Sequence, residues 1–257
     1  MGSQGGSIVR KPRFLCLHGF RTSAEIMKIQ LHKWPKAVID RLDLVFLDAP
    51  FPCQGKSDVD GIFDPPYYEW FQFNEEFIEY ENFENCLEYL EDRMIKLGPF
   101  DGLIGFSQYI YFAYHFSEKT PYLIYSFILQ GGILSGGLPG LQAKGIALQK
   151  VPKIKFIIII GGAMFRSTKV VEDAYSFSID TPSLHFLGET DFLKPYGIKL
   201  IESFKNPVVV HHPKGHIVPR IDEKSLEKVT AFLETIENLV MMEEEDKDGE
   251  ENICSPI

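Results

Sequence analysis

Short apolar runs and amphipathic stretches alternate along this chain. Two long segments, at 82–97 and 226–240, space their apolar residues by three or four, as one face of an α-helix does. The shorter runs predict strands and lie at 14–17, 44–47, 101–104, 154–160, 182–188 and 207–210. Such alternation is typical of an α/β protein with a mostly parallel central sheet and helices on both faces. The isoleucine-rich run at 154–160 predicts a central strand buried on both faces.

The pattern predicts one folded domain at residues 12–240. A chain of 257 residues with 45% hydrophobic residues can bury a sizeable core, and α/β proteins of this length are often single domains. Residues 1–11 are expected to form a flexible N-terminus. Residues 241–257 carry an acidic run at 243–251 that cannot build a core, so they are expected to form a disordered tail.

The net charge and the cysteine residues indicate which binding partners and which cellular compartments are expected for this protein. The net charge of −10 argues against a nucleic-acid partner. No secretory signal or stable membrane insertion is expected. Cys16, Cys53, Cys86 and Cys254 are scattered, without metal-ligand spacing, which indicates free thiols in the cytoplasm or nucleus and no metal. The oligomeric state is not predicted.

A catalytic motif follows the predicted strand at 101–104. Residues 105–108, Gly-Phe-Ser-Gln, are the first four positions of the G-x-S-x-G elbow, which holds a nucleophilic serine on a tight strand-to-helix turn. The fifth position is Tyr109, although the packing beneath the turn favours glycine there. The chain resumes at 130–132 with Gln-Gly-Gly, so removing 109–130 would restore an uninterrupted elbow. We therefore interpret 109–130 as an insertion after the nucleophile Ser107.

The insertion has an unusual composition. Eight of its 22 residues are Tyr or Phe, against 13% aromatic residues in the whole chain. A/T-rich codons produce such residues, which fits a retained intron or a gene-model error. The alternative is a real insertion, in which residues 109–116 form the helix after the nucleophile.

Two later segments complete a candidate catalytic triad. Asp191 follows the predicted strand at 182–188, and His216 lies in a loop after the strand at 207–210. The order Ser107, Asp191, His216 is that of α/β-hydrolases and differs from those of chymotrypsin and subtilisin. His216 would act as general base and Asp191 would orient its imidazole.

The first predicted strand delivers a loop suited to an oxyanion hole. This loop begins with His18, and we expect its oxyanion donor to be the backbone N–H of Phe20, with the N–H of Gln108 as the second donor. His18 is expected to be a structural, hydrogen-bonding residue rather than a base.

Alternatives remain for two members of the triad. Glu189 competes with Asp191, and it lies nearer the end of its strand. His211 and His212 compete with His216, but both lie at a strand end where structural roles are expected. His216 follows a glycine in a loop and is freer to reach over the sheet.

An aromatic segment lies in the connection at 51–77. Tyr68, Trp70 and Phe71 are candidates to roof a substrate cleft, because aromatic rings offer large apolar area at low entropic cost. The alternative is that Trp70 and Phe71 pack this connection onto the body of the domain.

Five motifs together resemble the FSH family of serine hydrolases, in the α/β-hydrolase superfamily. They lie at 17–21 (LHGFR), 48–50 (DAP), 67–71 (YYEWF), 105–108 (GFSQ) and 215–219 (GHIVP). The resemblance covers about residues 12–236 apart from 109–130, and extends to the esterase named after ovarian cancer-associated gene 2. It implies a carboxylesterase with a Ser-Asp-His triad, an acyl-enzyme, a small-molecule ester substrate and no cofactor.

The sequence differs from the pattern of this family at Tyr109, the fifth position of the elbow motif, where the family has a small residue. A second hypothesis therefore stands beside the first. In it the chain is a catalytically impaired hydrolase-fold isoform or a binding protein, because residues 109–130 disrupt the elbow.

Overall fold

The centre of the molecule is a six-stranded parallel sheet. The structure, a computed structural model, describes residues 10–74, 79–107 and 130–253, with residues 247–253 as backbone only. The strand order is β10-β9-β8-β7-β1-β2, and every neighbouring pair is parallel. The strands are β1 (Arg13–Leu17), β2 (Asp43–Leu47), β7 (Gly102–Phe106), β8 (Phe156–Ile160), β9 (Ser183–Gly188) and β10 (Val208–His212).

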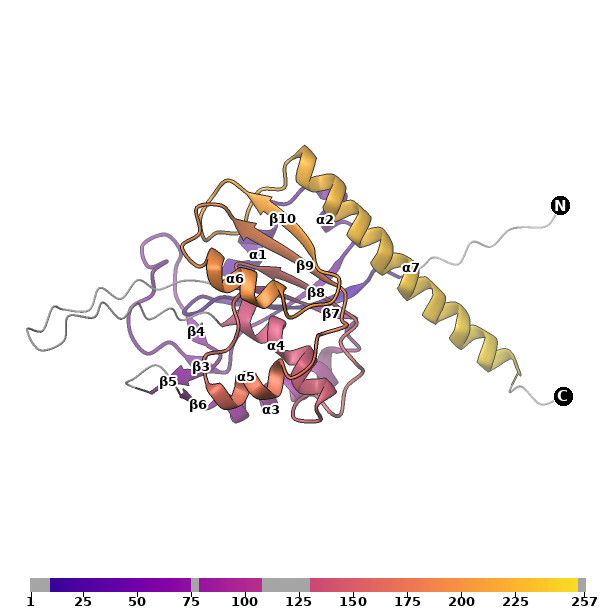
Figure 1. The fold of residues 1–257 in the computed structure, drawn as a ribbon, viewed down its shortest axis with the longest axis horizontal. Helices are drawn as coiled ribbons and strands as arrows, with labels where there is room; N and C mark the ends of the chain where they lie inside the picture. The colour runs from indigo at the N-terminus through magenta and orange to yellow at the C-terminus, as the bar shows by residue number, and fades with distance from the viewer. Residues whose placement is uncertain (1–9, 75–78, 108–129, 254–257) are drawn as a thin grey trace, which may run out of the picture.

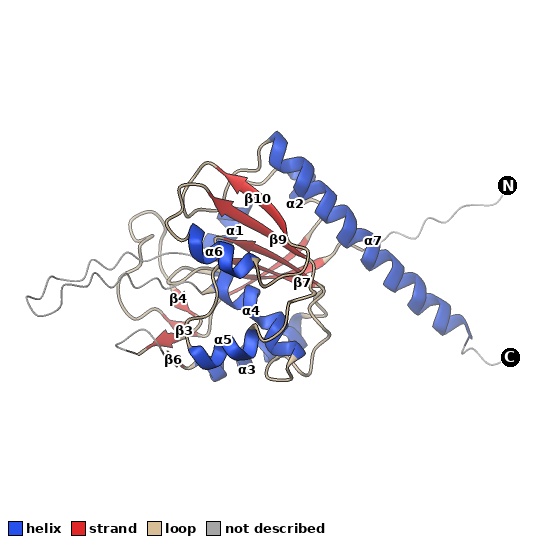
Figure 2. Cartoon of the chain, viewed as in Figure 1, coloured by secondary structure: helices blue, strands red, loops and turns tan. Residues whose placement is uncertain are grey.

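Helices cover both faces of this sheet (Figure 2). Alternation along β1 separates the two cores, because successive side chains of a strand point to opposite faces. Leu15 and Leu17 belong to one core, whereas Phe14 and Cys16 belong to the other. The first core contacts α3 (Phe83–Leu97), α4 (Gly131–Ala143), α5 (Thr168–Ala174) and α6 (Lys194–Ile201); the second contacts α1 (Ala24–Leu31), α2 (Lys36–Ile39) and α7 (Glu223–Ile253). The predicted parallel sheet with helices on both faces is confirmed.

The isoleucine-rich run forms a strand in the middle of the sheet. β8 pairs with β7 on one side and β9 on the other, and none of its five residues is more than 1% exposed. The strand begins at Phe156 rather than at residue 154. Such continuous burial explains why the run shows no polar alternation.

The connection between β2 and α3 contains two short antiparallel pairs. β3 (Phe51–Pro52) pairs with β4 (Tyr68–Glu69), and β5 (Gln72–Phe73) pairs with β6 (Tyr80–Glu81). This connection lies against the carboxyl end of β1, since the backbone N–H of Tyr68 donates to the carbonyl of Thr22 at 2.8 Å. It therefore borders the loop that follows β1.

The last helix is longer than the sequence pattern indicates. α7 continues to Ile253 and extends away from the sheet (Figure 1), through residues for which we predicted a disordered tail from 241. Ion pairs hold the start of this extension. Glu243 pairs with Lys155, and Glu244 pairs at 2.8 Å with Arg10, from the segment predicted to be flexible. Asp101 also forms ion pairs with both Arg10 and Lys155. The start of the acidic run therefore packs against two basic side chains from distant parts of the sequence, which hydrophobic periodicity does not predict.

No helix within the described ranges has the length and apolar character needed to cross a membrane.

Candidate active site

The carboxyl ends of the parallel strands meet at one edge of the sheet, where open α/β sheets bind ligands. Ser107 follows β7 directly, and the loop beginning at His18 follows β1, the neighbour of β7. Asp191 follows β9, and His216 lies in the loop after β10. The fold thus brings residues from four separate parts of the chain to the same edge.

Asp191 and His216 form a buried hydrogen-bonded pair. Nδ1 of His216 lies 2.7 Å from Oδ2 of Asp191, and the two side chains are 4% and 2% exposed. The other carboxylate oxygen accepts the backbone N–H of Leu193 at 2.8 Å. The carboxylate is therefore fixed from two sides, and it holds the Nδ1–H tautomer of the histidine.

Two glycines make room for this pair. Gly161, with φ +60°, passes so close to the imidazole that a Cβ would lie 2.7 Å from Cε1 of His216. A Cβ at Gly188 would lie 2.5 Å from the carbonyl oxygen of Lys214, in the loop that carries the histidine. Larger residues at either position would displace His216 from Asp191.

Ser107 is fully buried beside the histidine. Within the described part of the chain its Oγ has no hydrogen-bond partner. Nε2 of His216 instead contacts the backbone carbonyl oxygen of Ser107. This contact occupies the nitrogen that must accept the serine proton, so proton abstraction requires that the carbonyl turn away from the histidine.

The start of α4 packs directly against Ser107. A Cβ at Gly132 would lie 2.9 Å from the Cβ of Ser107, and a Cβ at Gly131 would lie 2.6 Å from the carbonyl oxygen of Phe106. A Cβ at Gly105 would lie 2.2 Å from the carbonyl oxygen of Gly131. Gly131 therefore supplies the small residue that packs against Gly105 at this turn. Tyr109 and Gln108, to which we gave roles from the sequence, lie outside the described residues.

His18 is a buried structural histidine, as expected. Its Nε2 accepts the backbone N–H of Ala49 at 3.0 Å, so the proton is on Nδ1, which donates to the carbonyl of Gly19 at 2.7 Å. Burial lowers the pKa of His18 to about 4, which keeps the ring neutral. The ring thereby fixes the start of the loop that contains Phe20.

A buried ion pair beside this loop was not predicted from the sequence. Arg21 has a positive φ of 51°, and its guanidinium lies 4.7 Å from the ring centroid of Phe20. Its Nε pairs at 2.7 Å with Glu69, whose side chain is 2% exposed. The sequence feature that could have predicted this ion pair is the single residue charged at pH 7 in each of two motifs, Arg21 at 17–21 and Glu69 at 67–71.

The aromatic candidates differ in position. Trp70 and Phe71 are fully buried, and Tyr68 is half-buried. Trp70 lies 5.1 Å from the ring of His18, and Phe71 packs among aromatic rings of the first core, including Phe83 at 5.3 Å. Trp70 and Phe71 thus hold the connection onto the body of the domain, as our packing interpretation expects.

The rival residues point elsewhere. Glu189 pairs at 2.6 Å with His211 on the surface, and it also pairs with Lys194. His212 is buried at the end of β10, where burial lowers its pKa. Within the described residues, Asp191 is hydrogen-bonded to His216 and to neither His211 nor His212.

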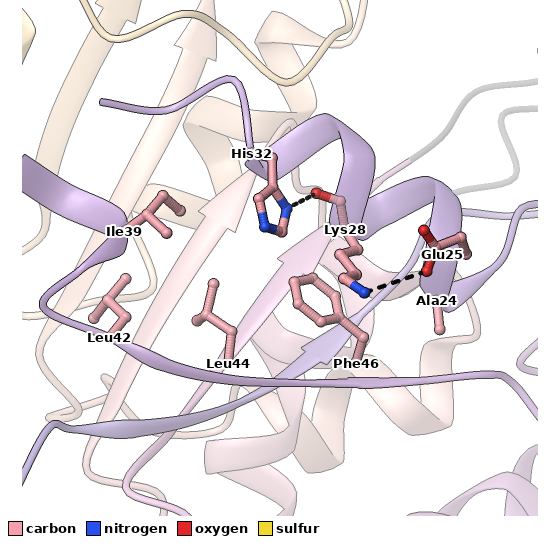
Figure 3. A pocket seen from close by; sticks show the side chains of 8 residues that line it. All are labelled: Ala24, Glu25, Lys28, His32, Ile39, Leu42, Leu44 and Phe46. Carbon is pink, nitrogen blue, oxygen red and sulfur yellow. Dashed lines mark hydrogen bonds and ion pairs between the residues drawn. The ribbon is translucent and has the colours of Figure 1, made fainter. Parts of the chain in front are cut away.

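The described residues contain no cluster of His, Cys, Asp or Glu able to hold a metal ion. A surface hollow of about 500 Å³ lies away from the catalytic edge, under α1 and beside the edge strand β2 (Figure 3). Its lining includes the Glu25–Lys28 ion pair, His32 and the apolar side chains of Leu44 and Phe46. In the sheet β1 lies between β2 and β7, the strand that Ser107 follows, so the hollow is separate from the candidate nucleophile.

Comparison with known proteins assigns this chain to a family of serine hydrolases. The family described as "Serine hydrolase (FSH1)" matches residues 7–120 and 123–227. An esterase of Anopheles gambiae is 29% identical over 231 residues, which are 85% of this chain and 76% of that protein. Esterase OVCA2 of Bos taurus is 28% identical over 226 residues, 80% of this chain and 89% of that protein.

A solved structure shows the same fold at low sequence identity. Acyl-protein thioesterase 2 of Zea mays superposes with a TM-score of 0.55 and 14% identity, covering 89% of this chain and 95% of that one. A carboxylesterase of Bacillus cereus gives a TM-score of 0.51 at 13% identity, with coverages of 90% and 92%. The predicted α/β-hydrolase fold is confirmed.

Proposed function

Because this chain belongs to the FSH1 family of serine hydrolases, we propose that it hydrolyses carboxylic esters of small molecules through Ser107, His216 and Asp191. The observation that carries the proposal is the buried 2.7 Å contact between His216 and Asp191, directly beside Ser107. A histidine held by a carboxylate next to a serine is the arrangement that activates a hydroxyl nucleophile. The esterases among the relatives support the ester as substrate.

The chemistry follows from the roles of the three side chains. His216 Nε2 takes the proton of Ser107 as Oγ bonds to the ester carbon, and the electron pair of the C=O bond moves to oxygen. When that pair returns, the C–O bond to the alcohol breaks, and the leaving alkoxide receives the proton from His216. Water then repeats both steps on the acyl-enzyme and releases the acid. Asp191 stabilises the imidazolium formed in each half-reaction.

The loop after β1 is suited to stabilise the oxyanion. We assign one donor to the backbone N–H of Phe20, whose loop is fixed by the hydrogen bonds of His18 and by the Arg21–Glu69 pair. A donor held rigidly needs no reorganisation when negative charge develops on the substrate oxygen.

A second candidate function has its own observation. The contact between Nε2 of His216 and the carbonyl of Ser107 leaves the Oγ without its base. A chain locked in this arrangement would be an impaired hydrolase or a binding protein. The two functions differ in whether the carbonyl of Ser107 turns away from His216 in solution.

A fluorophosphonate probe distinguishes the two functions, because it reacts only with an activated serine. We expect the full chain to be labelled and Ser107→Ala to be unlabelled. Labelling of the Ala variant at the same rate would refute Ser107 as nucleophile. An unlabelled full chain that is nevertheless folded, with a cooperative thermal unfolding transition, would favour the impaired hydrolase.

A further inference from the structure

Gln130 occupies an unusual position for a residue that precedes a helix. It is fully buried at the start of α4, yet its side chain does not cap that helix. Oε1 accepts the backbone N–H of Trp70 at 2.7 Å, and Nε2 donates to the carbonyl of Phe71. The amide thus joins the start of α4 to the 70–71 backbone through both of its polar atoms.

The same contacts continue to the loop after β1. Nε1 of Trp70 donates to the carbonyl of His18 at 2.8 Å. The start of α4 also touches that carbonyl, since a Cβ at Gly131 would lie 2.5 Å from its oxygen. Gln130 therefore links the helix start, through the backbone of residues 70–71, to the loop that carries Phe20.

The N-terminus of α4 lies beside the candidate nucleophile. The first N–H groups of a helix lack intrahelical partners, and the side chain of Gln130 at the N-cap does not cap them. Gly132 packs against Ser107, whose buried Oγ has no partner among the described residues. The first N–H groups of a helix beside a buried hydroxyl form an environment that stabilises negative charge at that point.

We propose that Gln130 supplies the second oxyanion donor beside Phe20, through its backbone N–H, while its side-chain amide positions that donor against the loop after β1. The inference rests on the proposed ester hydrolysis. From the sequence we expected Gln108 in this role, because it follows Ser107 directly. Gln130 takes it because α4, which packs behind Ser107, begins immediately after this residue.

Three matched glutamine substitutions in the full chain test the assignment. Gln130→Ala removes the proposed positioning amide, and Gln108→Ala removes the same side chain from the residue that follows Ser107 while it leaves both backbone N–H groups in place. Gln142→Ala is the matched control at the other end of α4, where a glutamine also joins two backbone segments, accepting from Ile154 at 2.9 Å and donating to Leu148 at 2.9 Å. The measurements are kcat and KM for p-nitrophenyl butyrate, the rate of fluorophosphonate labelling and Tm.

We expect Gln130→Ala to lower kcat and the labelling rate by roughly 10²-fold, since a misplacement of about 1 Å at a reacting centre costs that much. KM should stay within about twofold, because the donor acts on the charge that develops in the transition state. Gln142→Ala should lower Tm while kcat stays within about twofold of wild type. Gln108→Ala should change neither quantity beyond about twofold.

Two results overturn the inference while leaving the proposed function intact. One is an active wild type in which Gln108→Ala, and not Gln130→Ala, lowers kcat. The other is a Gln130→Ala variant that loses Tm like Gln142→Ala but keeps kcat, which would make the residue purely structural. A wild-type chain without labelling or hydrolysis refutes the proposed function, and the oxyanion role of Gln130 with it.

Discussion

At the scale of single residues, hydrogen-bond partners separate the structural histidines from the candidate base. His18 and His185 are buried, and their partners are backbone groups or the hydroxyls of Thr22 and Ser183. His216 alone among these three pairs with a carboxylate. Burial without a counter-charge keeps a histidine neutral, whereas a carboxylate stabilises the imidazolium that general-base catalysis must form.

Asp191→Asn tests this distinction. An asparagine keeps the size of the side chain but favours the wrong imidazole tautomer, so kcat should fall by roughly 10⁴-fold. The Glu189→Gln variant serves as control, because Glu189 pairs with His211 at the surface and should leave kcat within about twofold. Steady-state hydrolysis of p-nitrophenyl butyrate measures both. A larger loss in Glu189→Gln would assign the orienting role to Glu189.

The two buried neutral histidines predict that the free energy of unfolding decreases as the pH is lowered. Burial lowers the pKa of His18 to about 4 and that of His185 to about 3, from 6.5 in the unfolded chain. The unfolded state therefore binds more protons in the window between the folded and unfolded values, and the folded state loses stability as pH falls through it. Between pH 7 and pH 5, each histidine should reduce the free energy of unfolding by about 2 kcal/mol.

Urea unfolding at several pH values checks this expectation. His185→Gln removes one of the two titrations, so its loss of stability between pH 7 and pH 5 should be smaller by about 2 kcal/mol. An identical pH dependence in the variant and the wild type would mean that His185 is not held neutral in the folded state.

At the scale of elements, the junction between β7 and α4 determines the position of Ser107. Gly105 on the strand and Gly131 on the helix approach so closely that neither has room for a Cβ. Two elements separated in sequence thereby approach as closely as the strand and helix of a nucleophile elbow do.

Gly105→Ala should open this junction. Its Cβ would lie 2.2 Å from the carbonyl oxygen of Gly131, and such overpacking costs about 1–3 kcal/mol and displaces the helix. We expect a lower Tm together with a fall in kcat of at least roughly 10-fold. Gly61→Ala is the control: its φ of +80° makes an alanine costly by about 1–2 kcal/mol, but nothing lies within 4 Å of the added Cβ.

The two glycine variants should thus lose similar stability, and only Gly105→Ala should lose activity. If kcat fell equally in both, the loss would come from general destabilisation and not from the β7–α4 junction.

At the scale of the whole molecule, the sequence places 22 residues between Ser107 and Gln130, yet both lie at the same edge of the sheet. The two positions lie together, because Gly132 touches Ser107. Deleting residues 108–129 or residues 109–130 yields the same polypeptide, since each deletion removes one of two glutamines and leaves Gly-Phe-Ser-Gln-Gly-Gly.

We expect this deletion variant to be the better esterase. Joining Ser107 directly to the helix start should form the tight turn of an elbow, which directs the serine carbonyl away from His216 and frees Nε2 to act on Oγ. General-base catalysis contributes roughly 10²–10⁴ in rate, and the deletion should raise kcat/KM by at least about 10²-fold. Hydrolysis of p-nitrophenyl butyrate by the two purified forms measures the difference. Equal kcat/KM would show that the full chain already has a working elbow.

The sequence by itself determined the features that depend on local pattern. Runs of apolar residues predicted the strands of the parallel sheet, and a spacing of three or four predicted α3 and the first half of α7. Order along the chain also gave Ser107, Asp191 and His216 as candidates, because parallel strands deliver their following loops to one edge.

Only the tertiary structure decided which of these residues touch. It paired Asp191 with His216 and buried Trp70 under the loop of His18. It also placed Gln130 at the start of the helix behind Ser107 and joined its side chain to the backbone of Trp70. No sequence pattern around Gln130 predicts that contact. These contacts join segments that are far apart in the chain. Hydrophobic periodicity predicts which face of a segment is buried, but it does not predict which side chains of other segments pack against that face.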